Sequence, residues 1–297
     1  MSKTIKLITQ AKINLFLNVI GKRRDGYHKV EMIMQTIDLA DKLYFTKIRE
    51  GIEIEVEHPE VPTGADNLVY QAVQLLFDRY TLSGGLNIKI KKKIPVAAGL
   101  AGGSTNAAAT LVAVDELCDL KLSKSELRDL GAQIGADVPF CITGGTALAT
   151  GIGTDLKELT AVPQLDLVIV KPPIAVSTAE VYNNLNLAEI KRKPDLNKMK
   201  RALKDQDKMK IIQASDNLLE EVTFNYYPQL KKLKKLLLTQ GAIKVLMSGS
   251  GPTLLGFVES ADKAEGLAAL LKNKLADNYI VQAVKTSLQG ITQQEEG

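Results

Sequence analysis

A glycine-rich loop between a predicted strand and a predicted helix, near residue 100, is the strongest local feature of the sequence. It reads Ile94-Pro-Val-Ala-Ala-Gly-Leu-Ala-Gly-Gly-Ser-Thr-Asn106, after an alternating run at 86–92 and before an alanine-rich run at 104–118. Its glycines permit a tight turn, and a helix N-terminus favours phosphate. The spacing matches neither a Walker loop nor a GxGxxG motif. By itself, the loop is compatible with an anion site or with a turn that only packs the helix.

The length of 297 residues indicates about two domains. Apolar residues make up 45% and charged residues 24%, the balance of an ordinary soluble globular protein. No apolar run approaches the roughly 20 residues of a membrane helix, and the N-terminus lacks a secretory pattern. Two cysteines give neither a disulfide framework nor a zinc motif. We therefore expect a reduced, cytoplasmic protein without a membrane partner.

Periodicity divides the chain into two halves. The first half is predicted to hold strands at 5–8, 13–20, 29–38, 42–48, 52–56, 86–92 and 144–151, with helices at 67–80 (capped by Asp66), 104–118 and 124–134 (capped by the box Ser123–Glu126). The second half is predicted to hold strands at 165–171, 244–247, 253–258 and 279–286, with helices at 178–184, 195–205, 207–222, 228–241 and 262–274. This is an α+β pattern. A composition shift predicts domains at 1–160 and 161–288, followed by a flexible tail at 289–297.

Four further motifs carry polar side chains suited to catalysis or binding. Asp137 follows a predicted helix end, where a carboxylate acts as a base, as a metal ligand, or only as a helix cap or Asx turn. Lys12 interrupts an apolar strand, so it either faces solvent or needs an anionic partner. Tyr27 and His28 lie in a predicted turn, where they either stack against a ring or are simply exposed. The glycine-rich turn Ser248–Thr253 is compatible with a plain hairpin loop.

The order of these motifs resembles that of the GHMP kinases, which phosphorylate small molecules. The resemblance rests on Pro95–Ser104, on a lysine in the first strands and on the late glycine-serine turn. Within this superfamily, four segments are together similar to the 4-diphosphocytidyl-2-C-methyl-D-erythritol kinases: Ala11–Leu15, Asp25–His28, Gly135–Pro139 and Met247–Thr253. The resemblance covers about residues 5–287. It implies an α+β fold of two domains, the first like ribosomal protein S5 domain 2 and the second ferredoxin-like, with ATP and substrate between them.

That family transfers the terminal phosphoryl group of ATP to the 2-hydroxyl of its cytidine-diphosphate-linked polyol, in the non-mevalonate (MEP) pathway to isoprenoid precursors. The resemblance implies that Asp137 is the general base and Lys12 its charged partner. It further implies that Gly249–Gly251 closes on the site from the second domain. The residues expected to bind the acceptor are Asn14, Tyr27, His28, Asn106, Thr178 and Tyr182.

The resemblance also implies ATP and Mg²⁺ as cofactors. The residues expected around ATP are Pro95, Val96, Ala97, Ala98, Gly99, Leu100, Ala101, Gly102, Gly103, Ser104 and Thr105, with Asn67, Leu68 and Lys92 near the adenine. At 97, 98 and 101 this chain carries alanine where many relatives carry glycine, which we expect to tighten the loop or to alter the affinity for ATP. No protein ligand for Mg²⁺ is assigned, although Ser104 is a candidate.

Two other functions remain open from the sequence. A GHMP kinase with a different small acceptor, in a host that uses the mevalonate route, fits everything except the Tyr27–His28 motif, because an aromatic that stacks on a base is needed only for a base-carrying acceptor. The lysine clusters allow a nucleic-acid-binding protein, yet the net charge is only +4 and tryptophan is absent. We therefore expect a small-molecule substrate and no nucleic acid. The oligomeric state is not readable.

Overall fold

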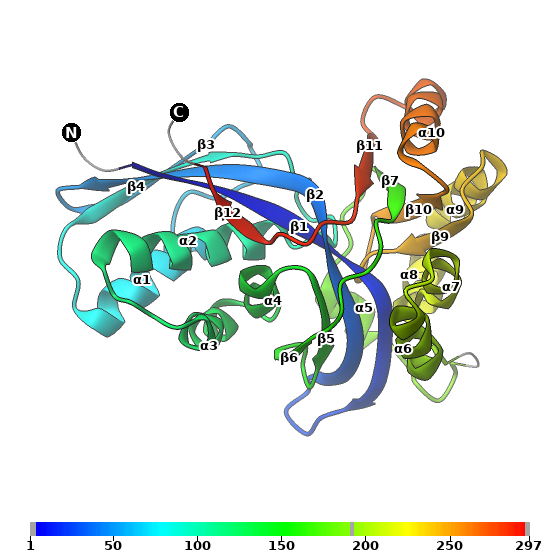
Figure 1. Cartoon of the computed structure of the whole chain (residues 1–297), viewed down its shortest axis with the longest axis horizontal. Coiled ribbons are helices and arrows are strands. Elements are labelled where there is room, and N and C mark those ends of the chain that lie inside the picture. The colour runs from blue at the N-terminus through cyan, green and yellow to red at the C-terminus, as the bar shows by residue number, and fades with distance from the viewer. Residues whose placement is uncertain (1–3, 191–192, 295–297) are drawn as a thin grey trace.

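The computed structural model describes residues 4–190 and 193–294, and the strands in these ranges form an eight-stranded and a four-stranded sheet. Figure 1 shows helices α1 to α4 gathered on one side of the first sheet, whereas α9 and α10 cover the second. Both sheets thus bury one face against helices, and the α+β class is confirmed. No helix within the described ranges has the length and hydrophobicity required to cross a bilayer.

The first half of the chain builds most of the larger sheet. Its strands are β1 (Thr4–Lys22), β2 (His28–Ile48), β3 (Gly51–Val56), β4 (Gly85–Lys91), β5 (Thr146–Thr150) and β6 (Asp155–Glu158). Its helices are α1 (Leu68–Tyr80), α2 (Gly102–Cys118), α3 (Lys124–Ile134) and α4 (Val138–Thr143). β1 and β2 form a long antiparallel pair, which is flanked by β12, β4 and β3 near its first end and by β8, β5 and β6 near its second.

β1 and β2 each join two strands that the sequence predicts as separate. The pairing continues through register shifts between Gln10 and Lys12, between Asn14 and Phe16, and between Val19 and Gly21. Such bulges bend a strand and re-aim its side chains. Both faces of β1 are buried from residue 11 to residue 17, and Lys12 is only 4% exposed. The interpretation of Lys12 as a surface residue is therefore excluded.

Two helix starts were predicted from their capping residues. Ser123 and Glu126 form the expected capping box at α3, which is thereby confirmed. The cap of α1 is Asn67 and not Asp66, because the Asn67 side chain accepts the bond from the Val69 amide. The predicted helix start was therefore one residue too early.

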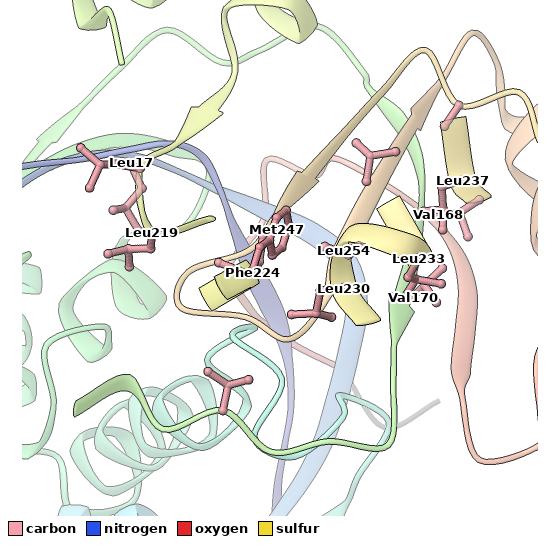
Figure 2. Close-up of a cluster of buried hydrophobic side chains, with 14 of the residues drawn as sticks. Leu17, Val168, Val170, Leu219, Phe224, Leu230, Leu233, Leu237, Met247 and Leu254 are labelled. Carbon is pink, nitrogen blue, oxygen red and sulfur yellow. The ribbon is translucent and has the colours of Figure 1, made fainter. Parts of the chain in front are cut away.

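The second half forms the smaller sheet and its helices. Its strands are β7 (Asp166–Lys171), β8 (Asp216–Asn217), β9 (Lys244–Met247), β10 (Leu254–Val258), β11 (Ile280–Lys285) and β12 (Ile291–Gln293). Its helices are α5 (Thr178–Asn183), α6 (Leu196–Asp205), α7 (Lys208–Ala214), α8 (Leu219–Tyr226), α9 (Gln229–Thr239) and α10 (Ala261–Lys274). The antiparallel order β11-β7-β10-β9 is ferredoxin-like, as expected. Figure 2 shows part of the core that packs α8 and α9 against β7, β9 and β10.

Two segments of the second half pair with β1 and differ from the sequence predictions. The helix predicted at 207–222 is wrong, because α7 ends before Ser215 and the short strand β8 pairs in parallel with Phe16 and Leu17. Within the predicted flexible tail, β12 pairs with residues 7–9 of β1. The division proposed at 160/161 falls in the connection between β6 and β7. Even so, β8 and β12 attach the second half to the first sheet.

Candidate active site

Two cavities open side by side in the chain and share Gly99, Ser104 and Asp137 in their walls. The first, here called the loop cavity, has a volume of about 360 Å³ and is bounded mainly by the glycine-rich loop and the start of α2. The second, here called the tyrosine cavity, has a volume of about 580 Å³ and is bounded by Tyr27 and Tyr182. Asp137 therefore lies at the junction of the two cavities.

The loop cavity gathers most of the residues expected around ATP. Those that line it are Asn67, Leu68, Lys92, Pro95, Val96, Ala97, Ala98, Gly99, Ala101, Gly102, Gly103 and Ser104. Leu100 and Thr105 do not. The Leu100 side chain is buried in the core, and the Thr105 hydroxyl donates to the Gln10 carbonyl at 2.9 Å. Contacts of these two residues with ATP were expected through backbone N–H groups, and they remain a prediction.

The N-terminus of α2 lies at the loop cavity, which is lined by Gly102, Gly103 and Ser104. The helix begins at Gly102 after Ala101 (φ 56°), whose methyl side chain has no acceptor to cap the helix. Uncapped helix amides and the helix dipole favour an anion. Ala97 is also left-handed, with φ 49°. Two of the three alanines that replace glycine thus occupy conformations that glycine adopts more readily.

Gly99 is the point where the loop meets the second half of the chain. Its φ is +72°, and a Cβ placed there would lie 2.4 Å from the Ser248 carbonyl oxygen. The Ser248 hydroxyl donates to the Gly99 carbonyl at 2.9 Å. This approach joins the turn 248–251 to the loop and requires glycine at position 99.

A buried carboxylate that the sequence analysis missed bonds to two residues that line the loop cavity, Lys92 and Asn106. Asp41 is 0% exposed and forms an ion pair with Lys92, and its other oxygen accepts the amides of Lys93 (2.7 Å) and Ile94 (2.9 Å). Asn106 donates to Asp41 at 2.9 Å and accepts from Lys92 at 3.2 Å. Asn106 therefore lies on the loop cavity and not on the tyrosine cavity, where its expected contact with the acceptor would place it.

Asn67 also faces the loop cavity, but its amide is already engaged. Its oxygen caps α1 by accepting the Val69 amide at 2.8 Å, and its nitrogen donates to the Pro62 carbonyl at 2.6 Å. Burial and capping therefore account for Asn67 without a ligand. Its contact with adenine remains a prediction.

Lys12, Asn14 and Asp137 form the polar centre of the junction. The Lys12 ammonium lies 3.4 Å from an Asp137 carboxylate oxygen and donates to the Asn14 side-chain oxygen Oδ1 at 2.9 Å. Asp137 precedes α4, yet its side chain makes no capping bond, so the interpretation of this residue as a helix cap does not hold. A partly exposed carboxylate beside a buried ammonium is thus free to accept a proton from a group in either cavity.

The tyrosine cavity brings together three rings from both halves of the chain. The His28 and Tyr182 rings lie 5.1 Å apart and are tilted by 37°, while Tyr27 is 63% exposed at the rim. Burial and the positive charge of Lys22 lower the pKa of His28 below its ordinary value. Burial and the nearby charge of Asp137 raise the pKa of the Tyr182 phenol. Both shifts favour the neutral forms of His28 and Tyr182, and neutral rings suit a flat ligand ring.

Thr178 and the turn at 249–250 close the tyrosine cavity from the second half. The hydroxyls of Thr178 and Ser250 lie 2.7 Å apart, and Gly249 and Ser250 both line the cavity. The expectation that this turn lies against the site agrees with the structure. The sequence analysis missed the apolar floor, which consists of Leu17, Val30, Met32 and Ile152.

Cysteine chemistry at the junction is disfavoured by the surroundings of Cys141. Cys141 lies in α4, and burial, together with the charge of Asp137, raises the pKa of its thiol to about 12. A thiol of this kind stays protonated at neutral pH. Cys118 and Cys141 are both free. Within the described ranges no three histidine, cysteine, aspartate or glutamate side chains gather in a way that could hold a metal ion.

Comparison with known proteins agrees with this geometry. The family description "GHMP kinases N terminal domain" matches residues 67–145, and "GHMP kinases C terminal" matches residues 189–277. The 4-diphosphocytidyl-2-C-methyl-D-erythritol kinase of Acetivibrio thermocellus is 44% identical over 282 residues, which span 95% of this chain and 100% of that protein. The protein of the same name from Bacillus velezensis is 47% identical over 275 residues, which span 92% and 95%.

Solved structures give the same result. A crystal structure of 4-(cytidine 5'-diphospho)-2C-methyl-D-erythritol kinase superposes with a TM-score of 0.79 at 31% identity, over 94% of this chain and 98% of that one. The homoserine kinase of Cytophaga hutchinsonii, at 20% identity, shares the fold with a TM-score of 0.77, over 99% of this chain and 98% of that one. GHMP kinases use ATP as phosphoryl donor. The chain is therefore a kinase that belongs to the 4-diphosphocytidyl-2-C-methyl-D-erythritol kinase family of the GHMP kinases.

Proposed function

We propose that this kinase phosphorylates the 2-hydroxyl of 4-diphosphocytidyl-2-C-methyl-D-erythritol, with Asp137 as general base and Lys12 as its charged partner. The observation that carries the proposal is the position of Asp137 at the junction of the loop cavity and the tyrosine cavity, 3.4 Å from the Lys12 ammonium. A donor in one cavity and an acceptor in the other would then meet at the carboxylate.

In the proposed reaction, the acceptor hydroxyl oxygen attacks the terminal phosphorus of ATP. A new P–O bond forms as the bond to the bridging oxygen breaks, ADP leaves, and Asp137 takes the hydroxyl proton. Phosphoryl transfer depends mainly on positioning and on stabilisation of charge. The Lys12 ammonium supplies positive charge at the junction, and Asn14 fixes it through the 2.9 Å bond. The α2 amides supply further donors from the side of the loop cavity.

Mg²⁺ fits this site as a companion of ATP. The cation is usually held by substrate phosphates, water and one or two protein oxygens rather than by a dedicated protein cage. Ser104 and Asp137 line both cavities and carry side-chain oxygens, so they are the candidates to lie near it. When bound, Mg²⁺ neutralises phosphate charge. Because Asp137 is the proposed general base, Ser104 is the residue that we propose to contact Mg²⁺.

The tyrosine cavity supplies the specificity in this proposal. The cytosine ring would stack on Tyr27 and Tyr182, and the neutral His28 ring would hydrogen-bond to it. The floor of Leu17, Val30, Met32 and Ile152 suits the carbon skeleton of the polyol. A small acceptor such as homoserine would leave the ring wall unused. Nothing in the site favours a different acceptor.

The position of the transferred phosphate tests this proposal. The purified protein is incubated with ATP, Mg²⁺ and the cytidyl acceptor, and the product is analysed by ³¹P and ¹³C NMR. We expect one new phosphate monoester, on the carbon that bears the 2-hydroxyl. A phosphate on another hydroxyl would overturn the assignment of the acceptor pose.

Tyr27→Ala is expected to raise the KM for the cytidyl acceptor about tenfold or more, because stacking of a base on an aromatic ring contributes about 1–3 kcal/mol. The KM for ATP should stay close to that of the wild type, since Tyr27 lines only the tyrosine cavity. Steady-state kinetics with each substrate varied in turn measures both constants. A selective rise in the KM for ATP would indicate that Tyr27 contacts ATP and not the cytidyl acceptor.

Acidification is expected to weaken binding of the acceptor through His28. Burial and Lys22 lower the pKa of His28, so the ring is neutral at pH 7 and gains a proton only below its ordinary value of about 6.5. Protonation places a cation where the cavity disfavours one, and the KM for the acceptor should rise between pH 7.5 and 5.5. His28→Gln, which does not titrate there, should flatten this rise. An unchanged pH profile in that variant would contradict the role of His28.

A further inference from the structure

We propose that Asn217 is a positioning residue of the phosphoryl transfer, which acts by holding the turn 248–251 against the junction of the two cavities. The inference rests on the proposed function, because it concerns how the acceptor is held beside Asp137. Asn217 lies outside both cavities, in the short strand β8 that interrupts the predicted helix. It is therefore not a catalytic residue.

The Asn217 side chain is fully engaged with the backbone of the second half. It is 0% exposed, and its nitrogen donates to the carbonyls of Met247 at 2.7 Å and of Gly249 at 2.8 Å. Its oxygen accepts the Leu219 amide at 2.9 Å. Only an amide supplies two donors and one acceptor in this arrangement. Asn217 thus bonds to the backbone on both sides of Ser248.

The turn that Asn217 holds touches all three parts of the site. Ser248 donates to the loop at Gly99, as described above. A Cβ at Gly249 would lie 3.6 Å from the Asn14 side-chain oxygen Oδ1, so the turn also lies close to the partner of Lys12. Ser250 bonds to Thr178 at the tyrosine cavity. A displacement of this turn therefore alters the acceptor wall and the loop together.

The other side of Asn217 is fixed to the strand that carries the catalytic lysine. Leu17 of β1 is the partner of Asn217 in the parallel pairing, and the Leu218 amide donates to the Leu17 carbonyl at 2.9 Å. Leu17 and Leu219 lie close together in Figure 2, on the side of Met247 away from β7, and all three belong to one buried cluster. Asn217 consequently sets the distance between the turn and the segment of β1 that carries Lys12.

Gln35 provides a matched control for the chemistry of Asn217. It is also 0% exposed, and its nitrogen donates to the carbonyls of Thr36 at 2.9 Å and Ser287 at 2.7 Å. Its oxygen accepts the Thr146 hydroxyl. Gln35 lines neither cavity. A change from amide to carboxylate removes two donors at either position, so the two variants share a similar structural cost but differ in their relation to the site.

The experiment compares Asn217→Asp with Gln35→Glu, well below the melting temperature of each. For Asn217→Asp we expect kcat to fall by about tenfold to hundredfold, or the KM for the cytidyl acceptor to rise by as much, because misplacement by about 1 Å has effects of that size. The KM for ATP should rise by a smaller factor, since Gly249 and Ser250 line only the tyrosine cavity and the turn reaches the loop cavity only through Gly99. Gln35→Glu should lower the melting temperature and keep wild-type constants. Equal constants in the two variants would overturn the proposal.

If Asn217→Asp does not fold, Thr223→Val tests the same proposal. The Thr223 hydroxyl donates to the Ser250 carbonyl at 3.2 Å and is the second attachment of the same turn. Valine has nearly the same shape but lacks the hydroxyl. A smaller loss of the same kind, in kcat or in the KM for the acceptor, supports the proposal, and wild-type constants contradict it.

Hydrogen exchange separates this inference from the proposed function. In the absence of substrate, the peptide covering residues 247–253 should exchange faster in Asn217→Asp than in the wild type, and Gln35→Glu should leave it unchanged. If the wild type has no turnover with the cytidyl acceptor, the proposed function fails, and the exchange result alone decides whether Asn217 holds the turn. Unchanged exchange at 247–253 would refute the positioning role regardless of turnover.

Discussion

Asp137→Asn is expected to lower kcat by about 10²–10⁴-fold, the usual contribution of a general base. The amide has the shape of the carboxylate but takes no proton from the acceptor hydroxyl. The KM for ATP should remain within a few-fold of the wild type, because the walls of the loop cavity other than Asp137 are unchanged. The measurement is a steady-state assay of ADP release with saturating acceptor, together with direct titration of ATP binding.

Asp129→Asn is the matched control for Asp137→Asn. Asp129 is an exposed residue of α3 that lines neither cavity, so the same loss of one negative charge should leave kcat and both KM values unchanged. A near-wild-type kcat for Asp137→Asn would remove Asp137 from the role of base. A fall of similar size in both variants would indicate a general effect of net charge.

Gly99→Ala is expected to reduce kcat/KM by about a hundredfold. The added methyl group would lie 2.4 Å from the Ser248 carbonyl oxygen, and the backbone φ of +72° disfavours any side chain. The loop and the turn must therefore separate, which disturbs the wall that both cavities share. Steady-state kinetics with each substrate should show both KM values affected, whereas the melting temperature falls only modestly.

Gly103→Ala tests whether the cause is steric. Gly103 belongs to the same loop and helix start, but a Cβ there meets only a Leu68 methyl group at an ordinary 3.6 Å. The loss of kcat/KM should be several times smaller than that of Gly99→Ala. Equal losses in the two variants would show that chain flexibility, and not the contact with Ser248, is what the loop requires.

Local sequence signals were sufficient where a short segment decides its own structure. The capping box at Ser123, the alternating strands and the glycine-rich turn at 248–253 each follow from side chains within a few residues. The placement of Lys12 at the site, by contrast, required the family resemblance. Periodicity alone left Lys12 open to a surface position, because residues 11–17 of β1 are buried on both faces and alternation does not reveal such a segment.

Long-range contacts explain what the sequence did not predict. Asp41 and Asp38 are similar acids in one strand, yet only Asp41 is buried, since it bonds to Lys92 and Asn106 far along the chain. The interruption between α7 and α8 depends on β8 pairing with β1 about 200 residues earlier. The sequence around Asn217 predicted neither the interruption between α7 and α8 nor the bonds of Asn217 to the turn.

The most direct test of the account is ADP release from ATP and Mg²⁺ with 4-diphosphocytidyl-2-C-methyl-D-erythritol, measured beside mevalonate, homoserine and galactose. Two adjoining cavities with Asp137 between them and a ring wall of Tyr27, His28 and Tyr182 predict turnover with the cytidyl compound alone. Turnover with one of the small acceptors, or no turnover with any of the four despite measurable ATP binding, would contradict the assignment of the tyrosine cavity to a cytidyl acceptor.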